Sequence, residues 1–340
     1  MCIRDSLCDG DVWGHVSPMF HLVDAFAIYA ITRVGGTHVV NQKFNAAGVL
    51  DTLERERVTC LNLASTMLTM LVHNPSAHRR DLTCLRILSC GGSPQSNSNV
   101  KKTISIFGCE FFVSYGMTEC CGKISMSLLP KDRKRMNPEA QLDLICTSGR
   151  PFVSIEVKVV QDDGAEVVWD DESLGEVVVR GPTVFDGYFN TSDPRSKHFR
   201  GDWFRTGDVA RVNSFGYITI ADRIKDMILC GGENVYCVEV ENILHAHPSV
   251  KQAAVFGTKD DIMGELVNAA LVLKEGEGGS RQGSQIRSYC AERMSSYKVP
   301  TKYHFLTSMP TTSSGKIMKN RLRGMFGPEA MRETRAEALE

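Results

Sequence analysis

The sequence predicts an α/β protein: a parallel sheet layered with helices, then a small antiparallel β-barrel or sheet, then a C-terminal α+β domain. Over residues 12–145, short apolar strands alternate with helical stretches, which is the pattern of a doubly wound parallel sheet. From Gly149 onward, the apolar residues recur at every second position, as they do in half-buried strands. From about Asp222, helices and strands mix in a third segment that has the length of an ordinary domain.

In the first region, apolar residues recur at helical spacing around residues 49–53 and 67–71. We expect the second of these helices to end at Asn74-Pro75, because proline cannot continue a helix. The expected strands are 37–40, 85–89 and 111–114. The last two strands run directly into unusual loops at 91–94 and 115–119, and ligands of parallel sheets bind at such strand ends.

The second and third regions follow different patterns. In the second, Ile155, Val157 and Val159 alternate with polar residues, and Asp162-Asp163-Gly164 is typical of a hairpin turn. Further strands are expected there at 177–180 and 217–220. In the third region, the expected elements are helices around 240–244 and 286–293, the latter ended by Val299-Pro300, and strands at 253–256 and 269–273.

Composition and charge exclude several classes of protein. The chain has 340 residues and a net charge of −1, so we expect no nucleic-acid partner. A basic run of Lys131, Arg133, Lys134 and Arg135 is read as a solvated loop, with a phosphate contact as the alternative. Twelve cysteines without a C-x-x-C pair favour reduced thiols in a cytoplasmic protein over a zinc site.

The N-terminal region carries neither a signal peptide nor a membrane span. The most apolar run, residues 20–34, is interrupted by His21, Asp24 and Arg33. The opening residues 1–6 resemble a translated sequencing adapter, so we expect them not to be native and the natural chain to extend upstream. Targeting to an organelle therefore stays open, as does the oligomeric state.

Six short motifs follow one another in a fixed order along the chain. They are YGMTE (115–119), DWFRTGD (202–208), GYI (216–218), DRIKDMI (222–228), GGENV (231–235) and PTTSSGKI (310–317). Each is weak alone, but the ordered set is specific, and from about Val16 the chain resembles the adenylate-forming family of acyl-CoA synthetases. The resemblance implies an ATP-dependent ligase that joins a carboxylic acid, with a fatty acid expected first, to coenzyme A through an acyl-adenylate, with Mg²⁺.

The resemblance also implies a domain organisation. The expected parts are an α/β core at 1–148, a β-rich subdomain at 149–221, a hinge at 222–226, a mobile lid domain at 227–327 and a tail at 328–340.

Asp208 and Arg223 are the expected ribose site. A carboxylate at a strand end can accept hydrogen bonds from both hydroxyls of a ribose. The resemblance gives Asp208 that role, with Arg223 assisting. The alternative is that Thr206-Gly207-Asp208 forms only a turn.

The two glycine-containing loops are the expected adenine and phosphate site. By resemblance, the backbone of Tyr115 and Gly116 flanks adenine, the Thr118 hydroxyl binds phosphate and Glu119 holds Mg²⁺. Alternatively, Glu119 is a helix N-terminal acid that the macrodipole favours. The remaining nucleotide contacts are expected from Gly91, Gly92 and Ser93, where glycine permits close backbone approach; a plain tight turn is the alternative.

The lid residues serve the two half-reactions. Lys316 follows a Thr/Ser/Gly stretch, and by resemblance it is the lysine that stabilises charge during adenylation. Lys225 occupies the hinge position, and Gly231 and Gly232 would line the pantetheine channel of coenzyme A. Outside the resemblance, both lysines would be ordinary surface residues.

The acyl pocket is expected near His21, Cys120 and Gly122. Pro18-Met19-Phe20-His21 resembles a family segment close to the acyl group, although His21 is equally well a helix-start or core histidine.

Two departures from the family pattern stand out. Cys237 replaces a proline that usually follows the Gly-Glu-Asn-x-Tyr string, and no Ser/Thr/Gly-rich loop ending in Pro-Lys-Gly precedes Pro18. That loop cradles the β- and γ-phosphates in the family, so we expect this chain alone to be weak or inactive. The alternative functions are a non-catalytic relative that binds nucleotide or acyl-adenylate, and an adenylation domain that loads a carrier protein.

Overall fold

The computed structural model describes residues 7–92, 97–130, 135–190, 195, 198–274, 282–312 and 315–327, without the side chains of Val23 and Asn97. The segment 1–6, the basic residues 131–134 and the tail 328–340 therefore lie outside the described residues. Within the described part, one compact unit holds 7–206, 210–220 and 315–316, and the other holds 207–209, 221–312 and 317–327.

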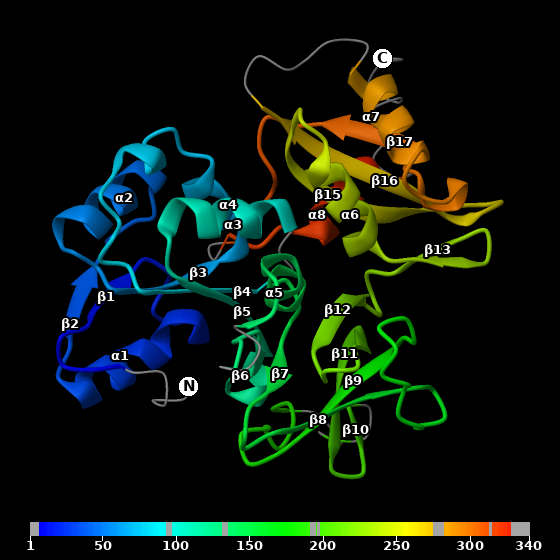
Figure 1. The fold of residues 1–340 in the computed structure, drawn as a ribbon. Coiled ribbons are helices and arrows are strands. Elements are labelled where there is room, and N and C mark those ends of the chain that lie inside the picture. The colour runs from blue at the N-terminus through cyan, green and yellow to red at the C-terminus, as the bar shows by residue number, and fades with distance from the viewer. Residues whose placement is uncertain are drawn as a thin grey trace. The chain divides into compact units, whose positions relative to one another are not determined.

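A seven-stranded sheet of order β2-β1-β3-β4-β5-β6-β7 forms the centre of the first unit (Figure 1). Its strands are β1 (Val12–His15), β2 (Thr37–Val40), β3 (Cys60–Ala64), β4 (Ile87–Gly91), β5 (Glu110–Met117), β6 (Gly122–Met126) and β7 (Arg150–Pro151). The strands from β2 to β5 pair in parallel, which confirms the predicted parallel sheet, whereas β6 and β7 add an antiparallel edge.

The helices of this unit are α1 (Leu22–Val34), α2 (Ala46–Arg55), α3 (Ser65–Val72), α4 (Asn97–Phe107) and α5 (Pro138–Ile145), with 3₁₀ turns η2 (Ala77–Arg79) and η3 (Thr118–Cys120). Helices α1 to α4 lie between the parallel strands in the chain, whereas α5 lies between β6 and β7. The predicted apolar positions of α2 and α3 are buried and join one core with strand residues such as Leu61 and Leu88. Helix α2 begins at Asn45, whose side chain accepts hydrogen bonds from two backbone N–H groups of the first turn.

The second sheet is antiparallel, as predicted. It has the order β10-β11-β9-β8, with β12 paired to β11. Its strands are β8 (Glu156–Val160), β9 (Gly175–Arg180), β10 (Phe199–Arg200), β11 (Trp203–Val212) and β12 (Ile218–Arg223). Ile155 and Val159 are buried while Glu156 is exposed, which confirms the period of two. The turn at Asp162-Asp163-Gly164 also forms, with Gly164 at φ 92°.

The third sheet belongs to the second unit and packs on its own apolar core. Its order is β14-β13-β16-β15, with β17 parallel to β16. The elements are β13 (Ile228–Cys230), β14 (Glu233–Val235), α6 (Cys237–Ala246), β15 (Val250–Asp260), β16 (Gly264–Leu273), α7 (Gln282–Ala291), η5 (Ser296–Lys298), β17 (Lys302–Phe305) and α8 (Lys319–Phe326). This α+β arrangement confirms the predicted class of the segment.

The predicted end of the second helix of this unit was wrong. Helix α7 ends at Ala291, well before Val299-Pro300. Ser295 takes an extended backbone at φ −60° and ψ 147°, and the 3₁₀ turn η5 then precedes Val299. The chain has therefore left the α-helical conformation before it reaches Pro300. The proline ends only the short 3₁₀ turn.

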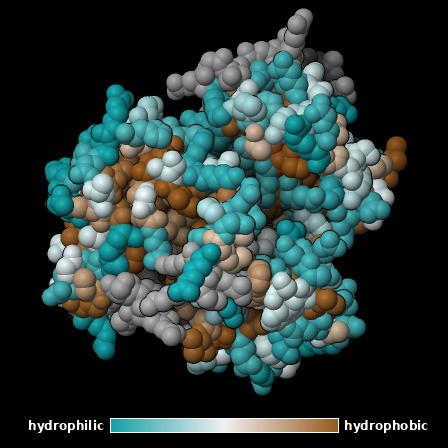
Figure 2. Space-filling model, viewed as in Figure 1, coloured by the Kyte–Doolittle hydropathy of each residue, from teal (hydrophilic) through white to brown (hydrophobic). Residues whose placement is uncertain are grey.

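The surface carries small apolar groups among polar residues. Figure 2 shows brown patches scattered between teal ones on the visible face, as is usual for a folded domain. In the part of the chain that the structure describes, no helix combines the length and hydropathy needed to cross a bilayer.

Candidate functional site

Gly91, at the end of β4, lies against the neighbouring strand β5. A Cβ atom at Gly91 would stand 2.8 Å from the Ser114 hydroxyl oxygen and 2.9 Å from the Ser114 carbonyl oxygen. Only glycine therefore fits at this strand end. Gly92 follows with φ 91°, a conformation that favours glycine, and has open space around its Cα. Ser93, the third expected contact of this loop, lies outside the described residues.

The expected loop 115–119 is instead the end of a β-hairpin. Tyr115 and Gly116 continue strand β5 and pair with Ser125 and Lys123 of β6. A Cβ atom at Gly116 would lie 1.9 Å from the Gly122 carbonyl oxygen, so the two backbones touch. This antiparallel pairing is why the loop prediction was wrong: β6 supplies hydrogen bonds that a free loop would lack.

Glu119 lies in the 3₁₀ turn η3, next to the exposed Thr118. Its carboxylate accepts a hydrogen bond from the Tyr188 hydroxyl at 2.8 Å, and its carbonyl accepts one from the Phe185 N–H, also at 2.8 Å. Burial, together with the Glu119 carboxylate, raises the pKa of Tyr188 to about 12, so Tyr188 stays protonated and donates. Tyr188 was not predicted, because no local motif marks a residue so distant in the chain.

The oxygen donors near Glu119 fit a hard cation held by few protein ligands. One carboxylate and the adjacent Thr118 hydroxyl are available on the same turn. Among the described residues, no cluster of three or more His, Cys, Asp or Glu side chains could hold a metal by itself. Mg²⁺ keeps several waters and shares its ligands with substrate phosphates, so this small donor set suits it.

Asp208 lies inside strand β11, neither at a strand end nor in a turn as the two sequence interpretations had it. Its side chain is 3% exposed, and its Oδ1 accepts a hydrogen bond from Arg223 Nε at 3.1 Å. Gly207 beside it has φ 72°, and its carbonyl accepts the Ile224 N–H at 2.9 Å. The second sheet thus brings the two predicted ribose residues into direct contact.

Lys225 is exposed in a tight turn between β12 and β13. The Arg223 carbonyl accepts hydrogen bonds from the N–H groups of Asp226 at 2.9 Å and Met227 at 3.0 Å, which closes the turn. The turn is therefore short, and both of these hydrogen bonds end on one carbonyl group.

Gly231 and Gly232 form the two-residue loop of the β13–β14 hairpin, because Cys230 pairs directly with Glu233. Both glycines have positive φ, 61° and 85°. Two-residue hairpin loops require such angles at both positions. The hairpin geometry by itself explains why both residues are glycine, independently of any role in a coenzyme A channel.

Cys237, the departure from the family pattern, ties helix α6 to the segment 222–226. Its N–H donates to the Asp222 carboxylate, and its thiol donates to the Asp226 carbonyl at 3.1 Å. Burial raises the pKa of Cys237 well above its usual value, so the thiol stays protonated. A proline could make neither bond. At this position, two hydrogen bonds of the cysteine take the place of the rigid ring of a proline.

A half-buried charge cluster lies beside this connection and was not predicted. Lys319 of α8 pairs with Glu241 of α6 at 2.8 Å, and Arg323 pairs with Asp226 at 2.9 Å. Burial opposes the Lys319 charge, but Glu241 outweighs it and the pKa of Lys319 is raised. For Asp222, burial is the largest influence and the pKa is raised.

Lys316 is exposed three residues before Lys319. It lies in the loop closed by the bridge between Thr311 and Ile317, next to Gly315 at φ 82°. An exposed lysine on a glycine-containing loop fits a group that is delivered by loop movement.

A pocket of about 290 Å³ in the first unit contains two of the three predicted acyl residues. Its lining residues are Leu22, Phe26, Cys120, Cys121, Gly122, Lys123, Phe152, Val153, Ser154, Ile155 and Thr183. His21 is not among them; it precedes α1 at the N-cap, and its ring lies 4.5 Å from that of Phe20. Burial raises the pKa of Cys120 to about 12, so this thiol is no nucleophile.

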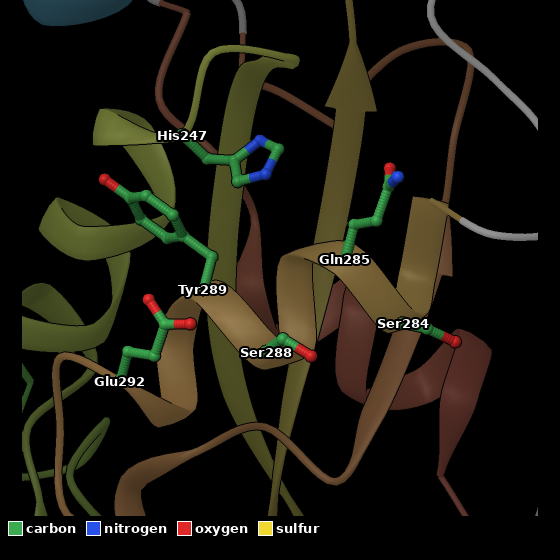
Figure 3. Close-up of a pocket in the computed structure, with 6 residues that line it drawn as sticks. All are labelled: His247, Ser284, Gln285, Ser288, Tyr289 and Glu292. Atoms are coloured by element: carbon green, nitrogen blue, oxygen red, sulfur yellow. The ribbon is translucent and has the colours of Figure 1, made fainter.

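A second hollow, of about 480 Å³, lies on the second unit and contains none of the predicted residues. Figure 3 shows side chains of α7 beside His247 and Glu292, with Ser284, Gln285, Ser288 and Tyr289 on the helix. The rings of His247 and Tyr289 meet edge to face at 4.9 Å.

Comparisons with known proteins agree with this architecture. Residues 1–189 match the family model of the AMP-binding enzymes, and residues 239–316 match that of the AMP-binding enzyme C-terminal domain. The chain is 31% identical to 2-succinylbenzoate–CoA ligase of Bacillus subtilis (strain 168) and 34% identical to feruloyl-CoA synthase of an Amycolatopsis species. These alignments cover 93% and 92% of this chain, and 61% of each relative.

A solved structure shares the fold at similar identity. It is the o-succinylbenzoate CoA synthetase of Bacillus subtilis in complex with the acyl-adenylate intermediate OSB-AMP, at a TM-score of 0.78 and 30% identity. The match covers 94% of this chain and 62% of that one. The same enzyme with ATP and magnesium ion matches at a TM-score of 0.77.

The fold thus defines a member of the adenylate-forming class of enzymes, built as two compact units. More particularly, the chain belongs to the AMP-binding, adenylate-forming family of acyl-CoA synthetases. It spans about 61% of the length of the curated relatives it matches.

Proposed function

We propose that the protein is an ATP-dependent carboxylic acid–CoA ligase that works through an acyl-adenylate. The observation that carries this proposal is the buried Asp208, held by Arg223 beside the turn that contains Lys225. A buried carboxylate is costly unless it is paired, here with Arg223, and a carboxylate is the group that can accept hydrogen bonds from both hydroxyls of a ribose. The family match over both parts of the chain supports the same function.

In the first half-reaction, a carboxylate oxygen of the acid attacks the α-phosphorus of ATP, and pyrophosphate leaves. Negative charge grows on the phosphate oxygens, and the ammonium of Lys316 would stabilise it. Thr118 would donate to a phosphate oxygen, while Gly91, Gly92, Tyr115 and Gly116 would line the adenine. Mg²⁺, when bound by Glu119, neutralises phosphate charge.

In the second half-reaction, the thiolate of coenzyme A attacks the acyl carbonyl carbon, and AMP leaves. Rotation about the turn that contains Lys225 would exchange Lys316 for the Gly231-Gly232 hairpin, whose small loop leaves room for pantetheine. The exposure of Lys225 supports this role, because an exposed residue can change its backbone angles without disturbing a core.

The acid itself is proposed only by class. The named relatives act on 2-succinylbenzoate and ferulate, and another, 31% identical, is a fatty acid–[acyl-carrier-protein] ligase of Streptomyces coeruleorubidus. We therefore propose aryl acids as the first class to test, ahead of the fatty acids that the sequence suggested, with His21, Cys120 and Gly122 near the acyl group. The aromatic walls Phe26 and Phe152 support this order.

The test is pyrophosphate exchange by the full product of the gene that encodes this chain. We expect acid-dependent exchange of pyrophosphate into ATP, and Lys316→Ala should slow it by roughly 100- to 1000-fold, because it removes a charge formed for the transition state. The same variant should still convert supplied acyl-adenylate and CoA into thioester. Equal loss of both steps would remove the assigned role of Lys316.

The choice of thiol acceptor distinguishes the CoA ligase from the two alternative functions, a carrier-loading domain and a non-catalytic relative. Coenzyme A and a pantetheinylated carrier protein are offered side by side with the preformed acyl-adenylate. Preference for the carrier would indicate a loading domain, and no transfer to either thiol would indicate a non-catalytic relative.

A further inference from the structure

Asp24, in the first turn of α1, is a fully buried carboxylate that neither half-reaction uses. Its Oδ1 accepts a hydrogen bond from the indole N–H of Trp13 at 3.0 Å, and its Oδ2 lies 2.9 Å from Nδ1 of His15. Trp13 and His15 are both buried and both belong to strand β1. Each oxygen of this carboxylate therefore has a partner on the sheet, and the two contacts fasten the start of α1 to β1.

His15 is held in turn by a second histidine. A carboxylate only accepts hydrogen bonds, so Nδ1 of His15 carries the proton, and Nε2 of the neutral ring accepts one. That Nε2 lies 2.8 Å from Nδ1 of His38, and Nε2 of His38 lies 3.0 Å from the Thr32 hydroxyl oxygen. Burial and the neighbouring His15 lower the pKa of His38, which favours a neutral ring that accepts the hydroxyl proton. The tautomer and the orientation of His15 are thus set from both sides.

The same turn of α1 contributes to the wall of the 290 Å³ pocket. Leu22 and Phe26, which line this pocket, lie two residues before and two residues after Asp24. The ring of Phe26 also meets the ring of Trp13 edge to face, with the centroids 5.7 Å apart. Because these residues share little more than one turn of a helix, a shift of Asp24 away from β1 would carry both pocket residues with it.

We propose that Asp24, held by His15 and Trp13, is a positioning residue that fixes the α1 wall of the acid-binding pocket. This inference rests on the proposed ligase function and on the proposed acyl pocket. Asp24 does not touch the acid and acts through Leu22 and Phe26. Loss of one donor leaves a buried carboxylate oxygen unpaired, and movement of α1 toward water relieves that cost. Acid binding should then weaken, whereas ATP binding, which is proposed on other elements, should not.

The experiment measures KM for the acid and KM for ATP in pyrophosphate exchange by the full product of the gene. The acids are ferulate, benzoate and octanoate. His15→Leu removes a donor to Asp24 and should raise KM for the acid by about tenfold, near the lower end of the worth of one hydrogen bond to a charged group. The kcat and KM for ATP should change by less than about twofold, because only acid binding is affected.

Two further variants of histidines show whether the hydrogen bond itself matters. His15→Asn keeps an N–H group close to the place of Nδ1, so it should keep KM for the acid within about threefold of the wild-type value. His73→Leu is the matched control. His73 belongs to the same unit and also makes a hydrogen-bond contact, 2.9 Å from Nδ1 to the Thr69 carbonyl oxygen, but it does not line the pocket. This variant should leave both KM values unchanged.

A second donor and a spectroscopic signal cover the case in which His15→Leu fails to fold. Trp13→Phe removes the indole N–H but keeps a ring against Phe26, so it should also raise KM for the acid alone. In the wild-type protein, the ¹⁵N signal of the Trp13 indole, identified by its loss in this variant, should shift when the acid is added. The indole signal of Trp203, which does not line the pocket, should stay in place.

Three results would overturn the inference and leave the ligase function intact. They are an unchanged KM for the acid in the folded donor variants, an equal rise of KM for acid and ATP, and a Trp13 signal that does not respond to an acid that supports exchange. Absence of exchange by the wild-type protein with all three acids would instead count against the ligase function, and the inference would fall with it.

Discussion

Glu119 shows how a single residue can be engaged before any ligand arrives. Its carboxylate already accepts the Tyr188 hydroxyl at 2.8 Å. If Glu119 also holds Mg²⁺, the tyrosine and the metal compete for the charge of one carboxylate. The protonated state of Tyr188, whose pKa is about 12, keeps that competition present at every physiological pH.

We therefore predict that Tyr188→Phe lowers the Mg²⁺ concentration needed for half-maximal pyrophosphate exchange. Removing one neutral-to-charged hydrogen bond frees about 1–1.5 kcal/mol, or roughly five- to tenfold in metal affinity. The measurement is a Mg²⁺ titration of wild type and variant at saturating ATP and acid. An increased Mg²⁺ requirement would mean that Tyr188 orients Glu119 for the metal and does not compete with it.

For the residues around Glu119, the sequence predicted the kind of side chain but not its partners. YGMTE led to Glu119 because a carboxylate beside a hydroxyl has a recognisable chemistry. Tyr188 could not be predicted in the same way, since 69 residues separate it from Glu119 and only the fold brings them together.

At the scale of elements, the second unit is held by charges as well as by its apolar core. Helix α8 carries Lys319 to Glu241 on helix α6, and Arg323 to Asp226. Both pairs lie close to the segment 222–226, which the Cys237 hydrogen bonds also anchor. Asp222 and Asp226, at the two ends of the proposed hinge, are thus held to the second unit, and the exposed Lys225 lies between them.

We predict that Lys319→Met destabilises the second unit by about 2 kcal/mol. This lies between the ~0.5 kcal/mol of an exposed ion pair and the ~3–5 kcal/mol of breaking a fully buried one, since both partners are 18% exposed. Urea denaturation followed by circular dichroism measures it. Lys251→Met, at an exposed position of β15, is the matched control and should change stability by less than about 0.5 kcal/mol.

The pH dependence of this pair has a definite sign. Folding raises the pKa of Lys319 above its ordinary value of 10.5, so its contribution is fully present below pH 10.5 and is lost as the pH rises through the folded value. The difference in stability between wild type and Lys319→Met should therefore be constant near neutral pH. A difference that disappears on going from pH 6 to pH 8 would contradict the assignment.

At the scale of the whole molecule, the residues proposed for the ribose end of a nucleotide site are present, whereas the family's phosphate-loop motif is not found in the printed sequence. Asp208 and Arg223 are both present and paired. No Ser/Thr/Gly-rich loop ending in Pro-Lys-Gly occurs in the sequence, so the β- and γ-phosphates have no glycine-rich cradle within it.

We accordingly predict that the 340-residue polypeptide binds AMP but supports little or no pyrophosphate exchange. AMP contacts only the ribose, adenine and α-phosphate, whereas exchange requires pyrophosphate to be held in place. Calorimetric titration with AMP and exchange assays on the same preparation measure the two properties. Full-rate exchange by this polypeptide would show that the cradle is dispensable.

The sequence by itself determined the layers of the fold and the order of the chemical groups. Periodicity and turn residues are local, so the parallel sheet, the alternating strands at 155–159 and the hairpin at 162–164 could be predicted from short windows. The tertiary structure alone decided that Glu119 meets Tyr188 and that Lys319 meets Glu241. It also decided that residues 115–117 form a strand, because the pairing of β6 with β5 depends on backbone contacts that no single window contains.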